Sequence, residues 1–119
     1  IEETAAKNPQ KAIYELYQLL KDGQAEIYIL TMVVYQYRNL LILKDMEERN
    51  PRINRFELAK KTHLHPFVIG KSLAILSKYT LQDLKKIYQK IMDFDVGIKT
   101  GKIEQRVALE LLVFQLTRS

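Results

Sequence analysis

Apolar residues near the start of the chain recur at the spacing of an amphipathic helix. Between Pro9 and Gly23 they stand three and four residues apart, which places four of them on one face: Ile13, Leu16, Tyr17 and Leu20. Asn8 suits the N-cap position and Pro9 the first helical position. Gly23 can supply the left-handed residue that ends a helix. The pattern therefore predicts a first helix between these limits.

The segment from Glu26 to about Arg49 is apolar on most sides of a helix. Three stripes run along it, which contain in turn Ile27, Leu30, Val34, Tyr37 and Leu41, then Ile29, Val33 and Leu40, then Tyr28, Met32 and Tyr35. A helix with so little polar surface is expected at the centre of a fold. Gln36, Arg38 and Asn39 interrupt the apolar run well short of the ~20 residues that cross a bilayer, so a membrane span is not expected.

Two shorter helices are predicted after Asn50-Pro51, because proline disfavours helical geometry in the residue before it. Asn54 can cap the first of them, which carries Phe56, Leu58 and Ala59. A turn follows at His63-Leu64-His65, and Pro66 suits the first turn of the second helix. The residues of this helix that we expect to face inward are Phe67, Ile69, Leu73 and Leu76. Gly70 within it suggests a close crossing of backbones.

The remainder of the chain predicts two longer helices joined by a glycine turn. Thr80 and Asp83 resemble a capping box, with aspartate in place of glutamate. The helix that they open carries Leu84, Ile87, Ile91, Phe94 and Ile98, and Gly101 is placed to end it. The final helix is expected to begin near Glu104 and to carry Val107, Ala108, Leu111, Leu112 and Phe114.

Length and composition agree with a helical domain. The chain has 119 residues, which is room for one domain at ~100–200 residues each, and we expect residues 1-119 to form a single helical domain. Three prolines and four glycines are too few for a sandwich or barrel, which needs a turn every ~8–12 residues. The predicted fold class is all-α, a compact bundle of five to six helices.

Two further features of composition bear on the setting of the chain. It contains no cysteine, which excludes a disulfide scaffold and a thiol nucleophile and favours a cytoplasmic location. It begins with Ile1 and lacks the basic start and apolar run of a signal peptide. We therefore expect a fragment of a longer polypeptide.

Positive charge is concentrated in the second half of the chain. The net charge is +5, from 19 basic and 14 acidic residues. Between residues 60 and 90 Asp83 is the one acidic residue, against Lys60, Lys61, Lys71, Lys78, Lys85, Lys86 and Lys90. This bias could attract phosphates or an acidic protein surface, or it could be a solvated set of helix faces.

Four candidate sites for chemistry fail on spacing. Residues 97–102 have two glycines and a lysine, but a phosphate-binding loop needs wider glycine spacing, Ser or Thr after the lysine, and a preceding strand. Lys99-Thr100-Gly101 also occurs in penicillin-binding enzymes, but here no serine is followed three residues later by lysine. His63 and His65 have no third metal ligand at a suitable spacing, so a capping or packing role is expected. Asp93 and Asp95 diverge around a helix. We expect no catalysis, no metal and no cofactor.

The two short helices have the rhythm of a helix-turn-helix over residues 55-77. Leu58 and Ala59 precede the turn, Leu64 lies within it, and Val68 and Leu73 lie on the second helix. A recognition helix offers Arg, Gln, Asn or Ser to base edges, whereas this one offers Lys71 as its strongest polar contact. A structural use is therefore favoured, and a DNA-binding module remains the alternative function.

The order of several segments resembles the C-terminal domain of the delta subunit of bacterial DNA polymerase III. The likeness covers nearly the whole chain and rests on residues 8–16, Gly23 before the long helix with residues 37–41, Leu64-His65-Pro66-Phe67-Val68, Ile98-Lys99-Thr100-Gly101-Lys102, and residues 108–112. One departure is Ala25, where many relatives have a proline-like helix starter. It affects the start of the second helix.

The resemblance implies a fold and a role. In this family two N-terminal domains of the AAA type, the first of which grips and opens the sliding clamp, precede a helical collar. The fragment looks like that collar, which would hold the delta subunit in a five-membered clamp-loader ring during DNA replication. The expected partners are the C-terminal domains of the other clamp-loader subunits, while clamp and DNA would be reached through the missing domains. The parent would be a non-catalytic subunit of the polymerase holoenzyme, without a membrane contact.

The resemblance and the last helix together supply candidate site residues. The family segments imply structural roles for Leu64, His65, Pro66, Phe67, Lys99, Thr100 and Gly101. The final helix is apolar on more than one face, which makes it the candidate subunit interface through Leu109, Leu112, Val113, Phe114 and Leu116.

Overall fold

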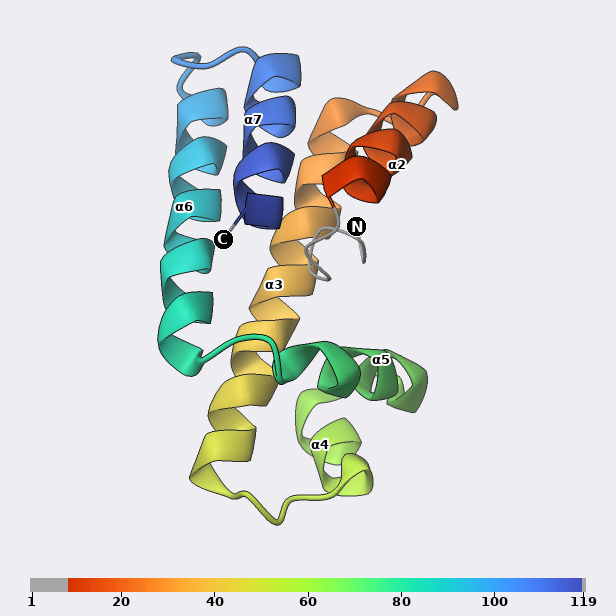
Figure 1. The fold of residues 1–119 in the computed structure, drawn as a ribbon, viewed down its shortest axis with the longest axis vertical. Coiled ribbons are helices and arrows are strands. Elements are labelled where there is room, and N and C mark those ends of the chain that lie inside the picture. The colour runs from red at the N-terminus through yellow and green to blue at the C-terminus, as the bar shows by residue number, and fades with distance from the viewer. Residues whose placement is uncertain (1–8, 119) are drawn as a thin grey trace.

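The computed structural model describes residues 9–118, and within them the fold is entirely helical (Figure 1). The helices are α2 (Pro9–Lys21), α3 (Glu26–Arg49), α4 (Arg55–Thr62), α5 (Pro66–Leu76), α6 (Leu81–Lys99) and α7 (Gln105–Arg118). This confirms the predicted all-α bundle. The predicted cap Asn8 and the side chain of Ile13 lie outside the described part of the chain.

Helix α3 runs through the middle of the molecule, with α2, α5, α6 and α7 packed around it (Figure 1). Its buried residues are Ile29, Leu30, Val33, Tyr37, Asn39, Leu40 and Leu43. The central position agrees with the sequence pattern. Along its third apolar stripe, however, Tyr28 and Tyr35 are exposed and Met32 is half-buried. The neighbouring helices leave these two tyrosines at the surface.

The core is one continuous cluster of buried apolar side chains. Besides the residues of α3 it contains Leu16, Leu58, Ile69, Leu76, Tyr79, Leu84, Ile87, Ile91, Leu109, Leu112, Val113 and Leu116. Fully burying a leucine or isoleucine contributes about 1.5–3 kcal/mol, so this cluster is the main source of stability. Tyr37 and Tyr79 lie within it, and burial raises the pKa of both hydroxyls above the ordinary value.

The turn between α6 and α7 reverses the chain, so that the two helices run antiparallel (Figure 1). Gly101 has φ 75°, in the left-handed region that glycine adopts without strain. The N–H of Lys102 donates to the carbonyl of Gly97 at 2.9 Å, and that of Gly101 donates to Ile98 at 3.1 Å. This pair of hydrogen bonds is a Schellman motif. A Cβ on Gly97 would lie 2.8 Å from Cδ1 of Ile103, so Gly97 leaves space for the returning chain.

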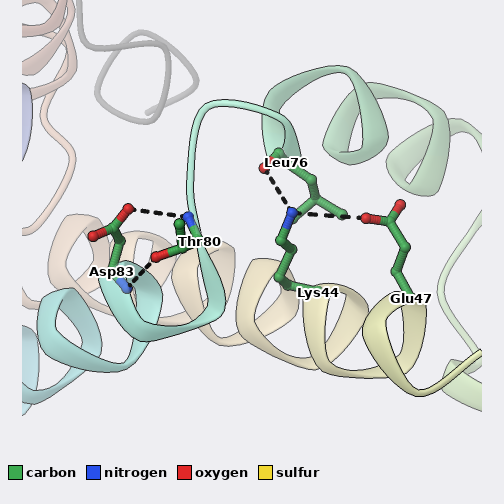
Figure 2. A network of polar contacts seen from close by, with 5 residues as sticks. All are labelled: Lys44, Glu47, Leu76, Thr80 and Asp83. Atoms are coloured by element: carbon green, nitrogen blue, oxygen red, sulfur yellow. Dashed lines mark hydrogen bonds and ion pairs between the residues drawn. The ribbon is translucent and has the colours of Figure 1, made fainter. Parts of the chain in front are cut away.

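Polar contacts hold the junction between α5 and α6 against α3 (Figure 2). Thr80 and Asp83 form the predicted capping box, since the Thr80 hydroxyl accepts from the Asp83 N–H and the Asp83 carboxylate accepts from the Thr80 N–H, both at 3.0 Å. Lys44 of α3 donates to the carbonyl of Leu76 at 3.4 Å and pairs with Glu47 at 3.8 Å. Its positive charge therefore lies at the C-terminal end of α5, where the helix dipole favours a cation.

Two predictions for the short helices are wrong. Phe67 was expected to face inward, but its side chain is 64% exposed, and Phe56 on α4 is 87% exposed. Helix α4 packs mainly on α5 and does not cover the side of its first turn that carries Phe67. Gly70 does not mark a crossing of backbones, because the group nearest to its position is the Arg55 guanidinium, 3.3 Å from where a Cβ would stand.

We predict that Gly101→Val lowers the free energy of unfolding by about 1 kcal/mol or more, because valine is strained at positive φ. Urea denaturation measures the change. Lys99→Ala is the control: Lys99 makes an exposed pair with Asp95 at 2.9 Å, so its loss should change stability by no more than about 0.5 kcal/mol. Equal effects of the two variants would contradict the turn assignment.

We also predict that the domain loses stability as the pH rises above 10, the ordinary pKa of tyrosine. Burial holds the pKa of Tyr37 higher in the folded state, so at alkaline pH the unfolded state loses this proton first and the free energy of unfolding falls. Urea titrations at several pH values should show a shallower fall for Tyr37→Phe. Tyr28→Phe, at an exposed position on the same helix, should retain the full slope; a matching reduction there would argue against the assignment.

Candidate functional site

The segment Leu64-His65-Pro66-Phe67 forms the turn from α4 into α5. His63 just before it has φ 61°, a left-handed conformation that ends α4. His65 is the N-cap of α5, and its Nδ1 accepts a hydrogen bond from the Phe67 N–H at 3.0 Å. Pro66 occupies the first turn, where its missing N–H costs nothing. Leu64 is half-buried against the core. The segment thus sets the angle between two helices.

The segment Lys99-Thr100-Gly101 lies at the other end of the molecule, in the turn from α6 to α7 (Figure 1). The Thr100 hydroxyl donates to the carbonyl of Val96 at 2.8 Å, while the Lys99 ammonium pairs with Asp95. Gly101 is the left-handed residue of the Schellman motif. The two family segments are therefore separate structural turns, and the fold does not bring them together into one site.

The acidic and histidine pairs also lie in local structure. Asp93 accepts a hydrogen bond from the Gln89 amide at 3.0 Å, and Asp95 is engaged by Lys99. His63 and His65 lie on either side of Leu64, one as a left-handed cap and the other as an N-cap. Within the described part of the chain, no group of three or more His, Asp and Glu side chains is placed to hold a metal.

Helix α7 divides its apolar residues between the core and the surface. Of the residues predicted as an interface, Leu109, Leu112, Val113 and Leu116 are buried in the core of this chain, and Phe114 remains 47% exposed. Val107 and Leu111 are exposed as well, and the spacing of four and three places them on one face with Phe114. The outward apolar stripe of α7 is therefore Val107, Leu111 and Phe114.

Two tyrosines of the adjoining α2 are also exposed. Tyr17 was predicted to face the core together with Leu16, but its hydroxyl instead donates to the Glu110 carboxylate at 2.9 Å. This hydrogen bond to Glu110 raises the pKa of Tyr17. Tyr14 stands one turn earlier on α2 and is more exposed. We call Tyr14, Tyr17, Val107, Leu111 and Phe114 together the α2–α7 surface. The spacing of three between Tyr14 and Tyr17 was the signal in the sequence that could have grouped them.

Polar side chains beside the α2–α7 surface have partners within the chain. Arg106 of α7 lies 3.4 Å from the carboxylate of Glu26 at the start of α3, and Glu110 accepts from Tyr17. These contacts join α2, α3 and α7 at one end of the molecule. The result is an aromatic and aliphatic surface bordered by polar groups that have partners within the chain.

The helix-turn-helix pattern corresponds to real packing between α4 and α5. Leu58 is buried, and Ala59, Leu64 and Leu73 pack against the core, as the pattern requires. The outer side of α5 carries Phe67 and Lys71, with the Lys71 ammonium 4.7 Å from the centre of the Phe67 ring. The lysines of residues 60–90 are exposed but are divided among α4, α5, the following loop and α6. The pattern thus builds the core and offers few groups for base recognition.

None of the helices between residues 9 and 118 is long and apolar enough to cross a membrane.

The chain is similar to known proteins over nearly all of its length. The family described as the DNA polymerase III delta subunit, C-terminal domain, matches residues 1–116. DNA polymerase III subunit delta of Bacillus subtilis (strain 168) is 26% identical over 102 residues, which cover 86% of this chain and 29% of that protein. The solved structure of the Bacillus subtilis DNA clamp loader delta protein shares the fold, with a TM-score of 0.87 and 23% identity over 98% of this chain and 34% of that one. The chain thus spans only a part of each relative.

We predict that His65→Ala lowers the free energy of unfolding by about 1 kcal/mol, because the first N–H groups of α5 lose their capping acceptor. Chemical denaturation measures this change. His65→Asn supplies an amide oxygen that can cap the same helix and should restore most of the loss. If the alanine and asparagine variants are equally stable, capping is not the role of His65.

Proposed function

Because the chain belongs to the family of C-terminal domains of the DNA polymerase III delta subunit, we propose that it acts as a collar. In this role residues 1-119 form one domain that packs against the C-terminal domains of neighbouring clamp-loader subunits. It thereby holds a delta-type subunit in the ring that loads the sliding clamp. Contacts with the clamp and with DNA would belong to the N-terminal part of the longer protein.

The observation that carries this proposal is the α2–α7 surface. Five large side chains are exposed there on two helices that pack together, and three of them are aromatic: Tyr14, Tyr17 and Phe114. Exposed apolar patches of this kind, bordered by polar groups, are typical of protein interfaces, in which aromatic residues supply much of the binding energy. At its border, Arg106 pairs with Glu26 and Tyr17 donates a hydrogen bond to Glu110, so these polar groups have partners before a neighbour binds.

The proposal narrows the interface expected from the sequence to the outer side of α7. Of the five residues expected at the interface, Phe114 is the one whose side chain a neighbouring subunit could contact in the folded domain. The other four are buried and pack α7 against the core: Leu109, Leu112, Val113 and Leu116. The proposed role needs no reaction at this chain, so we propose a non-catalytic part of the replication machinery that works in the cytoplasm.

We predict that Phe114→Asp in the full-length subunit weakens assembly with the other clamp-loader subunits by at least about tenfold, because it places a charge in a desolvated apolar contact. Analytical ultracentrifugation of the mixed subunits measures the loss.

Phe56→Asp is the matched control, since Phe56 is 87% exposed but lies on α4, at the opposite end of the molecule (Figure 1). This variant should assemble like the unmodified protein. Normal assembly of Phe114→Asp, or an equal defect in both variants, would refute the α2–α7 surface as the subunit contact.

A further inference from the structure

We infer that the groove between α3 and α5 binds an acidic peptide segment of a partner protein and holds one of its large apolar side chains. The groove has room for about 280 Å³. Its walls are mainly apolar and include Met32 and Tyr35 from α3 and Phe67, Val68 and Ile75 from α5. Phe67 is exposed and does not belong to the core, and in this proposal it forms part of the wall that contacts the peptide.

Two side-chain amides on α3 lie among these apolar walls. Gln36 and Asn39 both line the groove and are three residues apart, which places them on the same side of the helix. Asn39 is only 7% exposed, and Oε1 of Gln36 is buried with no hydrogen-bond donor from the described residues. A buried acceptor without a donor is unfavourable, so a ligand that donates an N–H to this oxygen after a rotation of the Gln36 side chain gains binding energy. A peptide backbone supplies an N–H and a carbonyl together, and an amide side chain can pair with both.

The charge around the groove selects for an acidic segment. Residues 27–44 and 58–82, which contain every residue that lines the groove, include no aspartate or glutamate. Lys71 lies at the groove itself. A second depression of about 400 Å³ shares Tyr35 and Asn39 with the groove and is lined further by Arg38 and Lys61. The residues that line the two depressions include Arg38, Lys61 and Lys71 and no aspartate or glutamate, which favours a carboxylate-bearing partner.

The lining favours a peptide over a nucleic acid. Lys71 lies over the Phe67 ring, so its charge is held beside an apolar wall and not in a row of phosphate-binding cations. Nucleic-acid surfaces derive most of their affinity from several Lys or Arg contacts along the backbone. Here the apolar walls and the buried amides provide the larger part of the contact, as in sites that anchor one apolar residue of a peptide.

This groove is independent of the proposed subunit contact. Its lining residues lie on α3 and α5, and none of them belongs to the α2–α7 surface. Variants in the groove should therefore leave assembly through the α2–α7 surface unchanged, and the two proposals can fail separately.

The experiment selects peptides from a phage-displayed random library on the immobilised full-length protein. The expected peptides combine aspartate or glutamate with a large apolar residue. Binding of synthetic copies, measured by fluorescence anisotropy, should fall by at least about tenfold for Val68→Glu, which places a carboxylate in the apolar wall. The same fall is expected for Lys71→Glu, which reverses the charge at an exposed position.

Lys90→Glu is the matched control, because it makes the same charge change on α6, outside both depressions, and should bind the peptides normally. The inference is overturned if no peptide is selected, if the selected peptides lack acidic residues, or if the groove variants and Lys90→Glu behave alike. It is also overturned if oligothymidylate displaces the peptides from the unmodified protein and itself fails to bind Lys71→Glu, which would assign the groove to nucleic acid.

Discussion

The burial of α3 against α2, α5, α6 and α7 is the contact from which the rest of the arrangement follows. Seven of its side chains between Ile29 and Leu43 are buried, and each of these neighbouring helices covers a part of it. Apolar surface removed from water is the main favourable contribution to folding, so a long helix with several apolar sides requires several partners. Helix α4 packs chiefly on α5 and is therefore connected to α3 mainly through that helix.

Polar groups at the helix ends determine where the chain turns and so which helices can meet α3. The capping box at Thr80 and Asp83 starts α6, and the left-handed Gly101 ends it and returns the chain into α7. Lys44 connects the end of α5 to α3 across this arrangement. Each such contact contributes about 1 kcal/mol, far less than the core, but it stabilises one chain direction over its alternatives.

The two ends of the molecule have surfaces of different chemistry. One end carries the α2–α7 surface, where aromatic and aliphatic side chains such as Phe114 lie beside paired charges. The other carries the groove of α3 and α5, where buried amides and Lys71 accompany the apolar walls. An apolar surface with partnered polar groups at its border suits a lasting contact between folded subunits, whereas a groove with an unpartnered amide oxygen suits an extended segment.

The helices and their ends could be predicted from the sequence because the signals are local. The Asn54 side chain accepts a hydrogen bond from the N–H of Glu57, three residues later in the chain. Gly23 and Gly101 adopt positive φ, which no other residue type does as easily. The direction in which each apolar side chain faces was decided by the tertiary structure. Leu112 and Phe114 share a helix that is apolar on more than one side, yet one is buried and the other exposed. Periodicity identifies the residues that share a face, but burial depends on which other helix crosses that face, and this is set by contacts between segments far apart in the chain.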